Sequence, residues 1–259
     1  MSAAVRVERE GALAIVTVDH PPLNLWNSAL DAALRAAIDE LEREPPRGVL
    51  FRAEGRVVSG GVDVAEFAAQ ETAADATALF AGLIEIARRV DALPCPTVFA
   101  AHGLCLTWAF ELALACDLIV AARRAKFGLV EKVIGLTPAM GGTQRLAERA
   151  GTGRAREFVM TGVPYDAETL ERWNVVNRVF EDEDFETAAR ALADELAQGP
   201  TLAHAATKQV IRDYLQGGVE LANDRVPALA GDLFDTADLR AAVATFLEQG
   251  PGHAEFTGR

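Results

Sequence analysis

The sequence predicts a mixed α/β core followed by a helical C-terminal region. Three observations support this fold class. Short apolar or alternating runs typical of strands recur through the first 180 residues, and amphipathic helical patterns separate them. Beyond about residue 198 the patterns are helical only, and no internal repeat or low-complexity linker divides the 259 residues. We therefore expect a core over residues 1–197 and a helical module over residues 198–259.

Two strands open the chain. Residues 5–10 and 13–19 alternate apolar and polar side chains around a glycine, which is typical of a hairpin. HPPLN at residues 20–24 ends it, because proline cannot donate to a strand ladder. A helix follows that Asn27 or Ser28 caps and that a proline pair ends. Its apolar face is predicted to comprise Leu30, Leu34, Ala37, Ile38 and Leu41.

A strand and a second long helix come next. GVLFRA at residues 48–53 is a short buried strand, and a helix capped by Asp75 is expected over residues 76–93. Between them, Ser-Gly-Gly at 59–61 permits a tight turn and close approach of a ligand to backbone amides. From these residues alone, a plain strand-to-helix turn is the simpler interpretation.

Two acids in the central stretch are the main candidates for chemistry. A buried strand at 97–101 precedes an apolar helix at 107–116, which carries Glu111. A further strand at 117–121 leads to Glu131, which follows the run FGLV. A carboxylate among apolar side chains loses hydration, so its ionised form is disfavoured unless a partner compensates. Two such acids brought together make an acid/base pair, whereas either one alone reads as a helix cap or an ion-pair member.

The remaining elements are mostly helical. We expect one more strand at 175–180 and helices at 143–150, 154–160, 167–173, 183–197, 202–215 and 234–248.

Composition excludes several classes of function. The net charge of −13 disfavours binding to nucleic acid or to anionic membranes, which both need a basic surface. The three cysteines, Cys95, Cys105 and Cys116, lie in apolar contexts without metal-ligand spacing, so they read as buried free thiols and no metal site is expected. No signal core or membrane-length apolar run is found, which predicts a cytoplasmic protein.

Several motifs resemble the crotonase (enoyl-CoA hydratase/isomerase) superfamily in order and spacing. The resemblance runs from about residue 5 to the C-terminal FTGR. It is carried by PPLN at 21–24, SGGVDV at 59–64, FEL at 110–112, CDLI at 116–119, KFGLVE at 126–131 and TPAMGGTQRL at 137–146. It implies a β–β–α spiral core with an α-helical C-terminal trimerisation module, and hence a homotrimer or homohexamer.

The resemblance also implies a chemistry. Family members form an enolate from an acyl-CoA thioester, and two backbone N–H groups stabilise its oxygen; by motif these belong to Val62 and Trp108. Glu111 and Glu131 match the two positions that hold and activate water in hydratases, and the sequence leaves open which acid takes which role. The implied substrate-binding residues are Leu23, Ser59, Gly61, Asp63, Val64, Leu106, Val130 and Pro138.

Two departures from the family pattern bear on function. Relatives often carry consecutive glycines before the first glutamate, where this chain has Thr107-Trp108-Ala109, so the Trp108 indole lies either in the acyl pocket or in the core. Lysines that relatives use for CoA are replaced by Ala65 and by EQGPGHAEF near the C-terminus. Phosphate anchoring would then rely on other groups, of which the candidates are Arg52, Arg56 and Lys208.

The predicted function is hydration of a 2-enoyl-CoA by a lyase that uses no cofactor, since coenzyme A is part of the substrate. Isomerisation, hydrolysis or decarboxylation of an acyl-CoA is the alternative within the superfamily. A non-catalytic acyl-CoA-binding subunit is the alternative outside enzymes, motivated by Trp108 and by the missing lysines.

Overall fold

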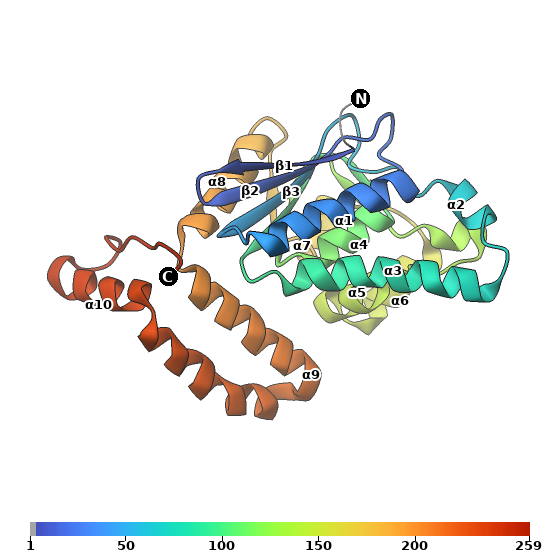
Figure 1. Cartoon of the computed structure of the whole chain (residues 1–259). Helices are drawn as coiled ribbons and strands as arrows, with labels where there is room; N and C mark the ends of the chain where they lie inside the picture. Colours follow the sequence, from blue (N-terminus) through green and yellow to red (C-terminus); the bar gives the residue numbers. More distant parts are fainter. Residues whose placement is uncertain (1–3) are drawn as a thin grey trace.

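A computed structural model (Figure 1) describes residues 4–259. Two β-sheets with intervening helices form its core. The larger sheet has the order β1-β2-β3-β4-β6-β9, and the smaller sheet has the order β5-β7-β8. In the larger sheet β1 pairs antiparallel with β2, and the other neighbours are parallel. The strands are β1 (Val5–Glu10), β2 (Leu13–Val18), β3 (Gly48–Ala53), β4 (Thr97–Ala101), β5 (Leu104–Leu106), β6 (Leu118–Ala122), β7 (Lys126–Gly128), β8 (Tyr165–Asp166) and β9 (Arg178–Phe180).

Ten α-helices and two 3-10 helices surround the sheets over the described residues. They are α1 (Ser28–Arg43), α2 (Val64–Ala68), α3 (Ala73–Ala92), α4 (Trp108–Ala115), η1 (Glu131–Ile134), α5 (Gly142–Ala150), α6 (Thr152–Thr161), α7 (Ala167–Arg172), α8 (Phe185–Gln198), α9 (Thr201–Asp232), η2 (Leu233–Asp235) and α10 (Ala237–Gln249).

A repeated strand–strand–helix unit places the two candidate acids. In each unit the first strand, β4 or β6, joins the larger sheet, and the second, β5 or β7, joins the smaller one. β5 and β7 pair in parallel with Leu106 opposite Gly128, so their carboxyl ends are adjacent. Glu111 lies in the first turn of the helix after β5, and Glu131 begins the 3-10 helix after β7. Two acids 20 residues apart in the sequence therefore lie on neighbouring segments.

Apolar clusters cover both faces of the larger sheet. Alternate residues of β2 show the division: Ala14 and Val16 belong to the cluster that includes α1, α3 and α4, whereas Leu13 and Ile15 pack with α8. Figure 1 shows α1 and α3 on one side of the sheet and α8 on the other. β4 is buried along its whole length, as expected for a parallel strand that helices cover on both faces.

The first helix confirms its prediction in detail. Asn27 is the N-cap of α1, and its side chain accepts a hydrogen bond from the Leu30 N–H. The buried residues of this helix are the five predicted from its periodicity. Local patterning therefore determines α1, because one apolar face and one cap suffice to specify it.

Within the core, the start of α3 and the start of the last strand were predicted wrongly. Thr72 caps α3, and Asp75 is its partner in a capping box at the third helical position, which moves the start back to Ala73. The strand expected at 175–180 begins only at Arg178. The amides of Val175 and Val176 instead bond to the Leu170 carbonyl at the end of α7, which delays the strand.

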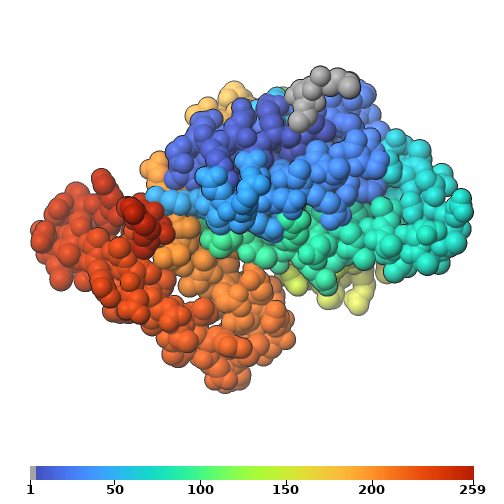
Figure 2. All heavy atoms as spheres, in the orientation of Figure 1, coloured from blue at the N-terminus to red at the C-terminus, as the bar shows by residue number. Residues whose placement is uncertain are grey.

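The C-terminal helices project from the core (Figures 1 and 2). The helix expected at 202–215 continues as α9 to Asp232, with a kink at Gly218, whose φ is +73°. The helix expected at 234–248 divides into η2 and α10, and Thr236 caps α10. The division of the chain at residue 197 stays a prediction. Over residues 4–259, no helix is both long and apolar enough to cross a membrane.

Candidate active site

A narrow pocket lies at the point where the two strand–strand–helix units meet. The volume open to the centre of a water molecule is about 20 Å³, which is room for roughly one ordered water. The pocket contains both acids and both predicted backbone donors, and most of its other walls are apolar. The lining residues are Trp26, Val62, Phe67, Phe80, Leu83, Trp108, Glu111, Glu131, Leu136, Thr137, Ala139 and Met140.

Glu111 is buried and held by backbone amides. Its side chain is 3% exposed, and Oε2 accepts hydrogen bonds from the N–H groups of Met140 (2.8 Å) and Gly142 (2.7 Å). Burial raises the pKa of Glu111 to about 6, and these two amides oppose the rise because they stabilise the ionised form. Gly142 therefore starts α5 and also contributes a donor to the site.

Glu131 has a different environment. It is 8% exposed, and Oε2 has no hydrogen-bond partner among the residues described. Burial and, to a lesser extent, the charge of Glu111 raise the pKa of Glu131 to about 8. Glu131 is therefore the more readily protonated of the two acids, and Glu111 is the more readily ionised.

Val62 and Trp108, the two predicted backbone donors, both line the pocket. Trp26 pairs with the residues on either side of Val62. Its N–H donates to the Gly61 carbonyl (3.0 Å), and its carbonyl accepts from the Asp63 N–H (2.9 Å). Trp108 is the first residue of α4, where N–H groups lack an intrahelical acceptor. Within residues 4–259, neither the Val62 N–H nor the Trp108 N–H has a hydrogen-bond acceptor. Both are free to donate to a ligand.

The Trp108 side chain is both a core residue and a wall of the pocket. It is 3% exposed, and its Nε1 donates to the Asn24 carbonyl at 3.1 Å. The same residue lines the pocket beside Glu111. The two placements that the sequence left open are therefore compatible. The indole of Trp26 differs from that of Trp108 in its hydrogen bonding: its buried Nε1 has no acceptor in the part of the chain that the structure describes.

Residues of the SGGVDV motif hold the turn around Val62. The Ser59 hydroxyl donates to the Asn24 carbonyl (3.1 Å) and accepts from the Gly61 N–H (2.9 Å). Gly61 has φ +116°, which a side chain would disfavour. The Asp63 carboxylate caps α2 by accepting from the Ala65 N–H. Ser59, Gly61 and Asp63 thus position the Val62 N–H.

The other predicted binding residues are not among those that line the pocket. Leu23 accepts from the Gly60 N–H in the turn before Val62. Leu106 and Val130 flank Gly128, where a Cβ would lie 2.8 Å from Leu106 Cδ2 and 3.3 Å from Val130 Cγ1. Pro138 is buried, and the Val64 side chain is largely exposed.

Sequence patterning missed most of the pocket's apolar wall. Trp26 lies two residues after the PPLN motif, which is the one local signal near it. Phe80 and Leu83 lie on α3, about 30 residues before the first acid, so only the fold brings them to the site. Phe67 lies on α2, which at five residues is too short to show a helical period.

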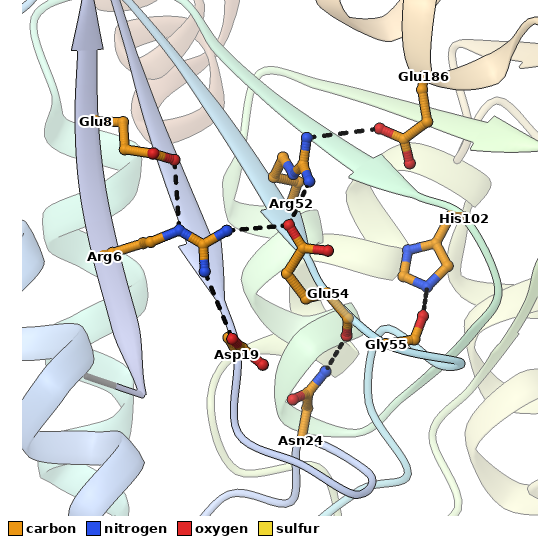
Figure 3. Close-up of polar contacts among 9 residues, drawn as sticks. All are labelled: Arg6, Glu8, Asp19, Asn24, Arg52, Glu54, Gly55, His102 and Glu186. Carbon is orange, nitrogen blue, oxygen red and sulfur yellow. Dashed lines mark hydrogen bonds and ion pairs between the residues drawn. The ribbon is translucent and has the colours of Figure 1, made fainter. Parts of the chain in front are cut away.

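Of the three candidates for phosphate binding, two are already engaged. Figure 3 shows Arg52 paired with Glu54 and Glu186. The Lys208 ammonium donates to the Asp117 carboxylate (2.8 Å) and to the Cys95 carbonyl (3.0 Å). Arg56 is exposed, and no carboxylate of the described residues lies within 4 Å of it.

Two other polar residues near the central strands, His102 and Asp117, have structural partners. His102 Nε2 lies 3.0 Å from the Gly55 carbonyl (Figure 3), and Asp117 accepts from the Thr97 N–H and hydroxyl. The three cysteines are buried and unpaired. Among residues 4–259, no group of three or more His, Cys, Asp or Glu side chains could hold a metal ion.

Comparison with known proteins identifies the family. The enoyl-CoA hydratase/isomerase family model matches residues 8–258. The chain is 29% identical to the short-chain-enoyl-CoA hydratase of Clostridium acetobutylicum, covering 95% of each chain. It is 35% identical to the carnitinyl-CoA dehydratase of Salmonella enteritidis over 225 residues, covering 85% of this chain and 84% of that one. A solved enoyl-CoA hydratase structure from Geobacillus kaustophilus, 30% identical, superposes with a TM-score of 0.90 over 99% of this chain and 98% of that chain. The chain therefore belongs to the enoyl-CoA hydratase/isomerase family and has the crotonase fold.

Proposed function

We propose that this protein adds water across the double bond of a 2-enoyl-CoA thioester. One observation carries the proposal: a single buried pocket contains two glutamates whose pKa values differ, about 6 for Glu111 and about 8 for Glu131. Hydration needs a base for the water and an acid for the α-carbon at the same time. A pocket with one ionised and one protonated carboxyl at pH 7 supplies both.

The proposed reaction begins with the water. Glu111 takes a proton from it while the water oxygen forms a bond to the β-carbon. The electrons of the double bond move onto the thioester, whose oxygen gains negative charge. The N–H groups of Val62 and Trp108 stabilise that oxygen, and each fixed donor of this kind contributes about 3–4 kcal/mol. Glu131 then delivers its proton to the α-carbon, which yields a 3-hydroxyacyl thioester.

The pocket favours a short acyl group. Its free volume of about 20 Å³ is the space of one water, so an entering acyl group must displace some of the four aromatic side chains that line it, and a short chain needs the smallest displacement. Coenzyme A enters as part of the substrate, and the proposed chemistry needs no separate cofactor. Of the three candidate cations for its phosphates, Arg56 is the one that is exposed without a partner among residues 4–259.

The assay uses crotonyl-CoA and product analysis by mass spectrometry. Hydration gives a product heavier by one water. Isomerisation of a suitable enoyl-CoA leaves the mass unchanged, hydrolysis releases free CoA thiol, and a non-catalytic acyl-CoA-binding protein binds the thioester without changing it. Absence of any hydrated product from short 2-enoyl-CoA substrates would refute the proposal.

A further inference from the structure

Thr107, the residue before the Trp108 donor, has an unusual backbone conformation. Its φ is +50° and its ψ is −118°, in the region that residues with a Cβ rarely adopt. A β-branched residue is particularly unfavourable there. The Thr107 N–H donates to the Gly128 carbonyl at 2.9 Å, so pairing with the end of β7 fixes this strained segment.

The Thr107 hydroxyl is also buried without a partner. The residue is 5% exposed, and Oγ1 makes no hydrogen bond to any part of the chain that the structure describes. A threonine at an N-cap ordinarily accepts from an N–H in the first helical turn, yet this side chain makes no cap bond. Burying an unpaired hydroxyl is unfavourable, so Thr107 carries two costs that a glycine would avoid.

The hydroxyl lies beside the turn that contains Val62. Oγ1 would be 3.5 Å from a Cβ built on Gly61, the residue before Val62. Thr107 itself precedes Trp108. The strained backbone, the unpaired hydroxyl and the two unpaired N–H groups therefore come together at one place.

We propose that the Thr107 hydroxyl is a third donor to the thioester oxygen, beside the N–H groups of Val62 and Trp108. This inference rests on the proposed acyl-CoA chemistry. The hydroxyl hydrogen points at the oxygen that gains charge, and a donor to a charged oxygen is stronger than a donor to a neutral one. The ligand thus supplies the acceptor that the protein does not, and the strain at Thr107 holds the donor in place before the reaction.

The test compares four variants. Thr107→Val removes the hydroxyl and keeps the shape, Thr107→Ser keeps the hydroxyl, and Thr107→Gly removes both the hydroxyl and the strain. Thr17→Val is the matched control, because Thr17 is another buried threonine whose Oγ1 has no partner in residues 4–259, on strand β2 away from the pocket. We expect Thr107→Val and Thr107→Gly to lower kcat/KM at least about tenfold. Thr107→Ser should stay within about threefold of the unmodified enzyme, Thr17→Val should be unchanged, and Thr107→Gly should melt at a higher temperature.

A second measurement does not depend on turnover. The carbonyl stretch of a ¹³C-labelled saturated acyl-CoA, measured by difference infrared spectroscopy, moves to lower frequency when donors polarise the oxygen. Thr107→Val should reduce this shift, and Thr107→Ser should restore it. If Thr107→Val and the unmodified protein showed equal carbonyl shifts and equal kcat/KM, the role of the Thr107 hydroxyl would be refuted and the proposed hydration activity would be unaffected. A shift that needs the hydroxyl in a protein that hydrates no enoyl-CoA would refute hydration alone, and failure to bind acyl-CoA would refute both.

Discussion

Gly142 and Glu111 are in direct contact. The Gly142 N–H donates to Glu111 Oε2 at 2.7 Å, and a Cβ on Gly142 would lie 2.6 Å from Glu111 Cγ. Any side chain at 142 must therefore displace the carboxylate that the proposed mechanism uses as a base.

Gly142→Ala tests this contact. We expect kcat/KM to fall by at least about a hundredfold, the scale typical of an acid/base group, because Glu111 moves and loses a fixed donor. Gly153→Ala is the control, since a Cβ there meets no atom within 4 Å. Equal activity in Gly142→Ala and Gly153→Ala would show that the position of Glu111 is unimportant.

Replacement of either acid should abolish most of the activity. Glu111→Gln and Glu131→Gln keep size and remove the titrating group, and each should lower hydration by about a hundredfold or more. Circular dichroism and Tm check that the fold persists. A near-normal rate in either variant, with the fold intact, would contradict the two-carboxylate mechanism.

The pH–rate profile should be bell-shaped. Activity requires ionised Glu111 and protonated Glu131, so it should rise with pH through about 6 and fall through about 8. Glu131→Gln should lose the upper limb in its residual activity. A single sigmoid in the unmodified enzyme, with no fall near pH 8, would show that Glu131 is not the acid.

The same pKa values predict how stability depends on pH. A glutamate whose pKa is raised to about 8 on folding binds its proton more tightly in the folded state than in the unfolded state. Its contribution to stability is fully present below the unfolded pKa of about 4.5 and is lost as pH rises through 8. We expect the Tm of Glu131→Gln to exceed that of the unmodified protein at pH 9, and the difference to shrink or reverse at pH 5. Thermal scans at both pH values measure it.

Self-association is expected through the C-terminal helices. Large apolar side chains are exposed there in the single chain, and water exposure of so many is unusual for a monomer. They include Val219, Val226, Phe234, Val243, Phe246 and Leu247. We propose a trimer or a dimer of trimers, and sedimentation at micromolar concentration checks it. Phe234→Asp with Phe246→Asp should shift the protein toward monomer, and a compact monomer of the unmodified chain would contradict the proposal.

The sequence predicted elements that depend on local patterning and missed those set by distant contacts. The face of α1 and its Asn27 cap follow from residues within one helix, so periodicity sufficed. The extension of α9 could not be predicted in this way, because three glycines and Pro227 argue against a helix between Leu215 and Asp232. There the chain turns at Gly218 and resumes helical structure beyond it.

The candidate site shows the same distinction between features that local sequence predicts and features that depend on distant contacts. Family motifs pointed to Glu111 and Glu131, and the structure brings both into one pocket. The donors to Glu111 come from Met140 and Gly142, about 30 residues further along, and no pattern links an amide to a carboxylate over that distance. The size of the pocket could not be predicted from the sequence either, because it depends on the orientation of the Trp108 indole.

Trp108 gives the sharpest test of substrate choice. Trp108→Gly removes a side chain that is both packed in the core and part of the pocket wall, so it should change stability and selectivity together. Loss of the indole should cost roughly 3–5 kcal/mol of stability through the cavity it leaves. Glycine at the start of α4 should add roughly 0.5–1 kcal/mol. The Asn24 carbonyl keeps a donor, the Ser59 hydroxyl, so it adds little further cost.

The expected gain is room for longer or branched acyl chains, because the backbone N–H at position 108 remains while the indole is absent. We therefore predict that kcat/KM falls for crotonyl-CoA and rises relative to it for longer 2-enoyl-CoA substrates. Trp108→Phe is the matched control: it keeps an aromatic ring, loses the bond to Asn24, and should show an intermediate Tm with nearly unchanged chain-length preference. Melting temperature and kcat/KM across an acyl-chain series, measured on both variants, decide the matter. Strong destabilisation of Trp108→Gly with unaltered chain-length selectivity would show that the indole is a core residue and does not bound the acyl pocket.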